Sequence, residues 1–193
     1  MRTASDTRAS QHLAFAMRTG SIRDIDALCA IDLGTAALFE QSGLTMDFPD
    51  DHEYSLHERA RWLRCLAARS AVLAVDEAGV ILGFAIMGEL DGDPYLEQLS
   101  VRMDVMRRGI GTALLNAAIG IARHQGARAL WLTTYAHLEW NRPFYEKKGF
   151  VLVPAGEYGD GLAREVDYQC RWLPRPEQRV VMRKPLGARS PCP

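Results

Sequence analysis

The sequence predicts an α/β protein built on one mixed β-sheet, with elements in the order β-α-α-β-β-β-α-β-α-β-β. Three patterns support this fold class. Two β-rich runs flank the turn sequence DEAG at residues 76–79, apolar residues recur at helical spacing from residue 25 to 38, and a helical pattern over residues 110–125 lies between two β-type runs. An antiparallel meander combined with a crossover implies a mixed sheet with helices on both faces.

The first third of the chain predicts one strand and two helices. Residues 12–18 have the composition of a short strand. Ser21 followed by Asp24 forms a capping-box pattern before an amphipathic helix that extends to Leu38. A second helix follows over residues 56–67, where Leu56, Ala60, Leu63 and Ala67 share one face.

Three strands come next. Residues 71–75 and 80–87 predict an antiparallel pair because the four residues between them have turn chemistry. A second turn, Asp91 to Pro94, leads into a strand over residues 95–101.

The last third predicts a parallel β-α-β unit and two closing strands. The helix at residues 110–125 ends at Gly126, a natural residue for a helix C-terminus, and a buried strand at 129–133 follows. A short helix over 141–149 precedes strands at 150–153 and 179–183, with a loop-rich insertion between them. We expect residues 179–183 to form an exposed edge strand that could pair two copies in a homodimer.

Composition is that of an ordinary globular domain, with 48% hydrophobic and 24% charged residues in 193. We predict one domain over residues 11–186, with flexible tails at 1–10 and 187–193. The net charge of −1 gives no overall field to attract nucleic acid or an anionic membrane. No run approaches the about 20 apolar residues that a membrane span needs, so a cytoplasmic protein without nucleic-acid or membrane partners is expected.

Cysteine spacing argues against a metal or redox centre. The four residues Cys29, Cys65, Cys170 and Cys192 lack the paired spacing of a zinc site or a C-x-x-C motif. We expect reduced thiols that lie away from the motifs below, and no bound metal.

A glycine-containing loop follows the strand that ends at Val101. Unpaired backbone N–H groups at a helix N-terminus favour an anion, glycine permits its close approach, and arginine forks strengthen phosphate contacts. The loop therefore predicts a cradle for a diphosphate, although the same pattern could merely shape a tight turn. A Walker A loop would need Lys and Ser or Thr after the second glycine, and a Rossmann fingerprint would need Gly or Ala where Leu114 stands. The cradle residues are Arg107, Arg108, Gly109, Ile110, Gly111 and Thr112.

The segment WNRPFYEKKGF, residues 140–150, carries a second pattern. Asn141 at the N-cap, Pro143 in the first turn and Gly149 at the end are explained by a short helix alone. Tyr145 is not, because Phe144 can fill the core while the phenol beside it projects from another face. A phenol at a crevice can donate a proton, whereas a packed ring is the structural alternative.

Together, R-R-G-I-G-x-x-L-L after the strand L-x-V and N-x-x-x-F-Y-E-K-x-G-F resemble the two signatures of the GNAT (general N-acetyltransferase) superfamily. The resemblance covers roughly residues 12–186 and implies a GNAT-like acyl-CoA N-acyltransferase fold. It implies transfer of an acetyl group from acetyl-CoA to a primary amine, with main-chain contacts from Leu99 and Val101 to the pantetheine arm. It also implies Asn141 as a further cofactor-binding residue and Tyr145 as general acid. Met106 departs from the family pattern, which has Gln or Arg at that position.

The amine must lose a proton before it attacks, either to a carboxylate or through water. Glu97, on the predicted cofactor strand, is our first candidate, and a solvent-facing glutamate is the alternative. Glu53 and Glu139 are weaker candidates, and His57, His124 and His137 are expected at the surface. A backbone N–H, that of Leu99, would bind the oxyanion.

The acceptor is left open, because the acidic residues Asp47, Asp50, Asp51 and Glu53 could attract a cation or simply be solvated. Polyamine, aminoglycoside, amino acid and peptide N-terminus are all compatible with the sequence. Two other functions also stay open: a non-catalytic acyl-CoA sensor or interaction module, and a domain that binds a different nucleotide diphosphate.

Overall fold

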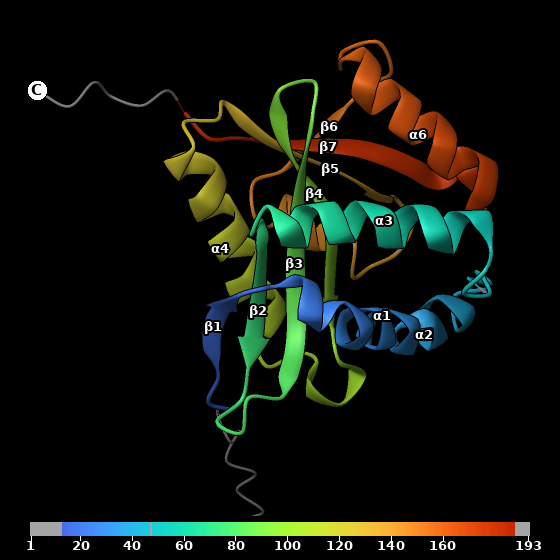
Figure 1. Cartoon of the computed structure of the whole chain (residues 1–193). Coiled ribbons are helices and arrows are strands. Elements are labelled where there is room, and N and C mark those ends of the chain that lie inside the picture. The colour runs from blue at the N-terminus through green and yellow to red at the C-terminus, as the bar shows by residue number, and fades with distance from the viewer. Residues whose placement is uncertain (1–12, 47, 188–193) are drawn as a thin grey trace, which may run out of the picture.

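The fold is centred on a seven-stranded mixed sheet (Figure 1). It is seen in a computed structural model that describes residues 13–46 and 48–187. The strand order across the sheet is β1-β2-β3-β4-β5-β7-β6. The strands are β1 (Ala16–Thr19), β2 (Ala71–Val75), β3 (Ile81–Leu90), β4 (Asp93–Val101), β5 (Ala129–Tyr135), β6 (Val151–Val153) and β7 (Arg179–Pro185).

Helices cover both faces of this sheet. One face packs against α4 (Ile110–His124), and the other packs against α1 (Ile25–Gly34) and α3 (Glu53–Ala67), which cross in front of the strands in Figure 1. Alternating residues divide the core accordingly: Ala74 and Ala85 join the α4 side, whereas Leu73 and Phe84 join the α1 and α3 side. The remaining helices are α2 (Ala36–Glu40), α5 (Arg142–Glu146) and α6 (Asp160–Trp172), with short 3-10 turns at Ile22–Asp24, Met103–Val105 and Pro176–Gln178.

Most of the predicted elements are confirmed. The β4-α4-β5 unit is a parallel crossover, and all other strand pairs in the described sheet are antiparallel. Asp76 shapes the predicted hairpin turn, because its carboxylate accepts from the N–H groups of Ala78 (3.0 Å) and Val80 (2.8 Å). The Ser21–Asp24 capping box is also present. The first helix, however, is interrupted at Thr35, and part of the predicted first strand, residue 12, lies outside the described residues.

The loop-rich insertion predicted between the closing strands is wrong, because it contains the 13-residue helix α6. Asp91, in the turn between β3 and β4, accepts hydrogen bonds from the N–H groups of Gly161 (2.7 Å) and Leu162 (2.8 Å). A Cβ at Gly159 or Gly161 would collide with this carboxylate. The start of α6 is therefore fixed by a residue from a distant turn, and its glycines allow that approach.

The predicted edge strand is also wrong. Residues 179–183 belong to β7, which lies between β5 and β6 and pairs with both. The edge on that side is β6, where Val151 and Leu152 are exposed. Within the described residues, no helix has the length and apolar character that crossing a membrane requires.

Candidate functional site

The two middle strands of the sheet separate after a short contact. Within the described chain, β4 and β5 share one register pair, Tyr95 with Trp131, so the rest of β4 has no ladder partner on that side. Just past β4, the N–H of Arg102 donates to the oxygen of Leu82 in β3 (2.9 Å). Because alternate residues bond to the same neighbour in an antiparallel ladder, the main-chain groups of Leu99 and Val101 face the gap. An extended ligand can add to this free edge as a strand would.

The N-terminus of α4 lies just beyond this edge. Its first helical hydrogen bond runs from the N–H of Ala113 to the oxygen of Gly109 (3.0 Å), so the N–H groups of Ile110, Gly111 and Thr112 precede the helical ladder. Gly109 has φ +85°, which favours glycine, and a Cβ there would meet no described atom within 4 Å. The predicted cradle is thus an open helix N-terminus suited to an anion.

The basic residues of the loop point to the same use. Arg107, with φ 61°, and Arg108 are both exposed beside the open N-terminus, where their guanidinium groups can reach a diphosphate. Packing does not demand glycine at 111, since a Cβ there would lie 3.6 Å from Val101 Cγ2, an ordinary contact. The free edge, the open helix N-terminus and the arginines together could hold a ligand that has an extended arm and a diphosphate.

A cleft of about 850 Å³ extends from the gap toward α1, α2 and α3. Of the predicted site residues it brings together Glu97, Leu99, Val101, Asn141 and Tyr145, and Met106 also lines it. Asn141 is the N-cap residue of α5, but its side chain makes no capping hydrogen bond within the described structure. Residues that precede or begin α3 also line the cleft, namely Phe39, Phe48, Asp50 and Tyr54, and Gln169 and Leu173 line it from α6 and the residue after it.

Tyr145 lies in α5, which its own segment positions against the sheet. Its ring packs edge-on against Phe144 (centroids 5.2 Å apart) and Phe150 (5.5 Å), while the residue also lines the cleft. Burial raises the pKa of the phenol well above its ordinary value, and Arg179 opposes this rise. The ring is therefore packed, as the structural alternative proposed, and also faces the cleft as a protonated phenol.

Glu97 is the extra residue of a β-bulge. Ile86 pairs with Gln98 and Met87 with Leu96, so Glu97 has no partner on β3. The bulge turns the side chains of Glu97 and Gln98 toward the same face, where Glu97 contacts Arg61 of α3 and Gln98 contacts Asp32 of α1. The solvent-facing alternative for Glu97 is wrong, since its side chain is 6% exposed.

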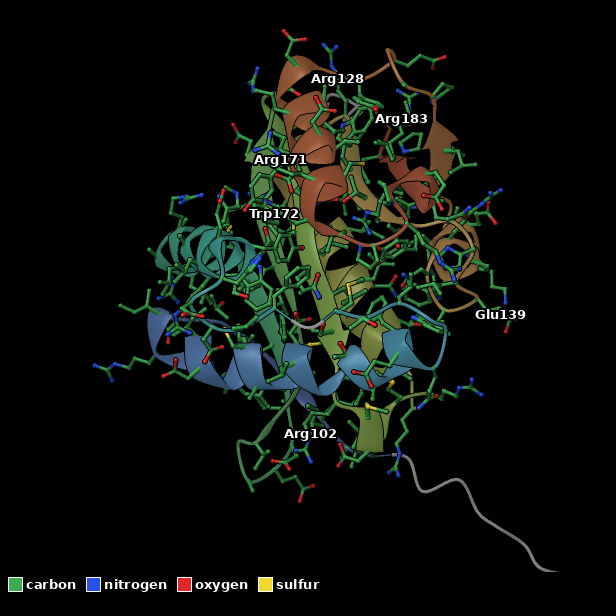
Figure 2. All side chains as sticks on the ribbon, turned by 90° about the vertical axis from the view of Figure 1, so that its right-hand side faces the viewer. Arg102, Arg128, Glu139, Arg171, Trp172 and Arg183 are labelled. Carbon is green, nitrogen blue, oxygen red and sulfur yellow. The ribbon has the colours of Figure 1, made fainter. Side chains whose placement is uncertain are left out.

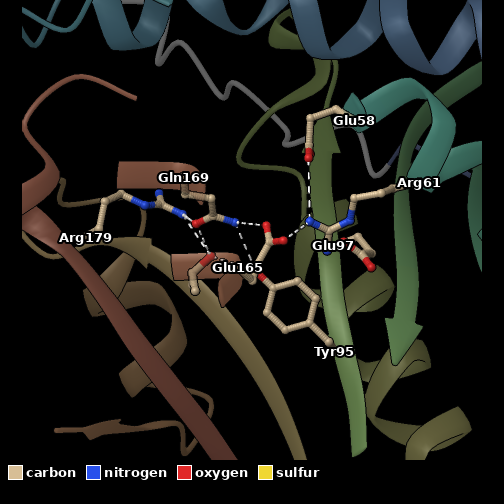
Figure 3. Close-up of polar contacts among 8 residues, drawn as sticks. Glu58, Arg61, Tyr95, Glu97, Glu165, Gln169 and Arg179 are labelled. Atoms are coloured by element: carbon tan, nitrogen blue, oxygen red, sulfur yellow. Dashed lines mark hydrogen bonds and ion pairs between the residues drawn. The ribbon is translucent and has the colours of Figure 1, made fainter. Parts of the chain in front are cut away.

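Three carboxyl groups lie around the guanidinium of Arg61. It forms ion pairs with Glu97, with Glu165 of α6 and, at 3.7 Å, with Glu58 of its own helix (Figure 3). Burial raises the pKa of Glu97 to about 7, because the opposing effect of Arg61 does not cancel it and Glu165 adds to the rise. A carboxyl group with that pKa can exchange a proton near neutral pH.

Sequence reasoning missed two further acids that line the cleft and have raised pKa values. Burial raises the pKa of Glu58 to about 8, and its Oε1 is buried without a hydrogen bond in the described structure. Asp32 accepts hydrogen bonds from Gln98 and from the hydroxyl of Ser100 (2.7 Å), and burial raises its pKa as well. No local motif surrounds either residue, and only their positions on the inner faces of predicted helices could have indicated them.

The other predicted candidates fall outside the cleft. Glu53 is exposed, and Glu139 projects from the surface (Figure 2). His124 and His137 are exposed as predicted, whereas His57 is half-buried against the ring of Tyr168, with centroids 4.2 Å apart.

One cysteine prediction is corrected. Cys29 lines the cleft, although burial raises the pKa of its thiol and so disfavours the reactive thiolate. Asp47 and Cys192 lie outside the described residues.

A free strand edge that lines a cleft, with an open helix N-terminus just beyond it, is the architecture of an acyl-CoA-dependent acyltransferase. The family model described as Acetyltransferase (GNAT) family matches residues 37–150, more than half of the chain. The protein therefore belongs to the GNAT acetyltransferase family and has its CoA-binding fold.

Solved structures agree with this fold. A GNAT-family acetyltransferase from Staphylococcus aureus Mu50 is 17% identical, with 90% of this chain and 100% of that chain covered and a TM-score of 0.68. The PaiA N-acetyltransferase from Thermoplasma acidophilum, solved with coenzyme A, is 18% identical over 89% of this chain and 99% of that chain (TM-score 0.61). The ribosomal-protein-S18-alanine N-acetyltransferase from Escherichia coli is 19% identical over 93% and 99%, with a TM-score of 0.59.

Proposed function

We propose that this protein transfers the acetyl group of acetyl-CoA directly to a primary amine of a small molecule or peptide. The observation that carries the proposal is the position of Tyr145, whose phenol faces the same cleft as the free edge of β4. The solved N-acetyltransferases with this fold, one of them in complex with coenzyme A, support the same reaction class.

When bound, acetyl-CoA supplies a thioester whose C–S bond breaks as the amine nitrogen bonds to the carbonyl carbon. The N–H of Leu99 faces the gap and can donate to the carbonyl oxygen as negative charge develops there. Tyr145 then gives its proton to the departing sulfur. Its raised pKa keeps the phenol protonated at neutral pH, as a general acid must be.

Glu97 is the proposed acceptor of the proton that the amine loses. Glu97 lines the cleft at the bulge, and its pKa of about 7 leaves a large ionised fraction at neutral pH. Direct transfer is preferred to an acyl-cysteine, because burial raises the pKa of the Cys29 thiol, which lines the cleft, and so disfavours its thiolate.

A non-catalytic acyl-CoA-binding module is the second candidate function. It would use the same cradle and free edge, with Tyr145 serving only in packing. The bulge that places Glu97 beside Arg61 and the acids that line the cleft favour catalysis, because a sensor of acyl-CoA does not require them.

The experiment combines binding and turnover. We would titrate the protein with acetyl-CoA by calorimetry and then follow release of the CoA thiol with a panel of amines. Tyr145→Phe should retain acetyl-CoA affinity and lower kcat by about 10²- to 10⁴-fold, the usual contribution of proton transfer.

Tyr158→Phe removes a hydroxyl that does not line the cleft, so it serves as the matched control. Unchanged turnover in Tyr145→Phe would assign the proton to another donor. Acetyl-CoA binding without thiol release would support the non-catalytic module.

A further inference from the structure

Arg179, the first residue of β7, is a cation of the cleft that has no carboxylate partner. No Asp or Glu of the described residues forms an ion pair with it, in contrast to Arg59 at the rim, which pairs with Asp26 at 2.7 Å. Its Nη2 donates to the hydroxyl of Thr133 (2.9 Å) and to Gln169, while its Nε is buried without an acceptor in the described structure. A half-buried guanidinium with spare donors is a binding position for an anion.

The surrounding residues hold this guanidinium in place. It lies over the ring of Tyr135, 4.7 Å from the centroid. Gln169, which accepts from Arg179, donates in turn to Glu165 (2.7 Å) and to the hydroxyl of Tyr95 (3.3 Å). Glu165 pairs with Arg61, so a continuous polar network links Arg179 to the acidic cluster (Figure 3). Because its position is fixed before any ligand arrives, Arg179 loses little freedom on binding.

Another side of the cleft carries acidic side chains. Asp32, Glu58 and Glu97 line the cleft, and within the described structure Arg61 is the guanidinium that pairs with two of them. Arg61 also binds Glu165, so three glutamates share one positive charge. An ammonium group is favoured on this side, and an anion is favoured beside Arg179.

We infer that the acceptor is an aminocarboxylate, whose carboxylate pairs with Arg179 while its amine faces Asp32, Glu58 and Glu97. This inference rests on the proposed function and narrows it to one substrate class. A carboxylate suits a single planar guanidinium, which can bind both of its oxygens. A phosphate carries more negative charge than the one uncommitted guanidinium among the described lining residues would balance.

The test compares acceptors that differ only in the carboxylate. Suitable pairs are tyrosine with tyramine, lysine with cadaverine and arginine with agmatine, each assayed by thiol release with saturating acetyl-CoA. For the pairs that the wild-type protein uses best, kcat/KM should be about 10- to 100-fold higher for the carboxylated member than for its decarboxylated partner. This is the range expected for a hydrogen bond between charged groups.

Arg179→Gln should remove this preference. The variant should lose about 10- to 100-fold in kcat/KM for carboxylated acceptors and stay within about twofold for their decarboxylated partners. Arg175→Gln changes an exposed arginine in the same segment and should alter neither series.

Three results would overturn the inference: no carboxylate preference in the wild-type protein, a preference for the decarboxylated amines, or an equal loss for both series in Arg179→Gln. The wild-type comparison decides the matter even if Arg179→Gln does not fold. If acetyl-CoA binds but no amine releases thiol, the proposed function fails, and calorimetry of the same pairs with the CoA complex still tests recognition of the carboxylate. Carboxylated members should then bind more tightly, and equal or weaker binding would refute the inference.

Discussion

Arg61 shows how single residues set the chemistry of the cleft. Burial lowers its pKa, but Glu97 and Glu165 outweigh this effect, so the guanidinium stays charged. It cannot neutralise three glutamates at once, and the pKa values of Glu97 and Glu58 are raised to about 7 and about 8. Burial raises both pKa values, and one arginine shared among three acids does not cancel that rise, so both carboxyl groups titrate near neutral pH.

Substitution of Glu97 by Gln tests its role as proton acceptor. Because a base must be ionised to accept a proton, wild-type kcat/KM should fall as the pH drops below about 7. Glu97→Gln should lower kcat/KM by about 10²- to 10⁴-fold and abolish this fall, measured as a pH-rate profile with one amine.

Glu58→Gln is the matched control, since it changes a second acid beside Arg61 that also lines the cleft. If Glu58→Gln abolishes the fall and Glu97→Gln retains it, the base is Glu58. If both variants retain it, water accepts the proton.

At the scale of elements, α6 depends on a residue that is distant in the sequence. Asp91 sits at φ 54°, an unusual backbone conformation for a non-glycine residue, and supplies the acceptor for two N–H groups of the first turn of α6. Glu165 and Gln169, which belong to the network around Arg61 and Arg179, lie on this helix. The β3–β4 turn thus supports the acceptor side of the cleft from outside it.

Asp91→Ala should lower the free energy of unfolding by about 0.5–2 kcal/mol, the usual cost of losing a helix cap. The measurement is urea denaturation, together with hydrogen exchange of the α6 amides, which should lose protection first. Asp91→Asn keeps an acceptor oxygen and tolerates the same backbone conformation, so it should lose less. Unchanged α6 protection in the alanine variant would show that the packing of Leu162 holds the helix without the cap.

The sequence predicted the elements whose signals are local. Strand β2, the Asp76 turn and α4 each follow from residues next to one another, and the same is true of Gly109 and Tyr145. Helix α6 was missed because its cap lies in another turn and glycines surround its start. Asp32, Glu58 and Arg179 were missed for a related reason. Each is an ordinary residue in its own segment, and only the folded arrangement of α1, α3 and β7 places all three in one cleft.

For the whole molecule, the gap between β4 and β5 divides the sheet into two unequal parts. Strands β1 to β4 form one ladder and β5, β7 and β6 form the other, and the single pair Tyr95–Trp131 joins them within the described sheet. A cofactor that binds along β4 would fill part of this gap. It would bind the folded protein and not the unfolded chain, so it should stabilise the fold.

Acetyl-CoA should therefore raise the melting temperature. At a free concentration of about 100 times Kd, the gain is about 2.7 kcal/mol, or about 5–10 °C for a protein of this size. Gly109→Asp, which places a carboxylate at the open helix N-terminus, should abolish the shift measured by thermal melting.

Gly79→Asp is the control, because Gly79 has a similar φ of +82° and open surroundings but lies in the hairpin turn before β3. Both variants carry the same backbone strain, and only Gly109→Asp should become insensitive to acetyl-CoA. A normal shift in Gly109→Asp would show that the diphosphate does not bind at the N-terminus of α4.

The bulge in β4 makes the number of residues in that strand as important as their identity. Deletion of Glu97, the residue between Leu96 and Gln98, would let the ladder with β3 continue without interruption. Successive side chains would then alternate strictly, and the face that Glu97 and Gln98 now share would keep Gln98 alone. Natural variants and engineered libraries of this protein should accordingly tolerate substitutions in β4 far more readily than insertions or deletions.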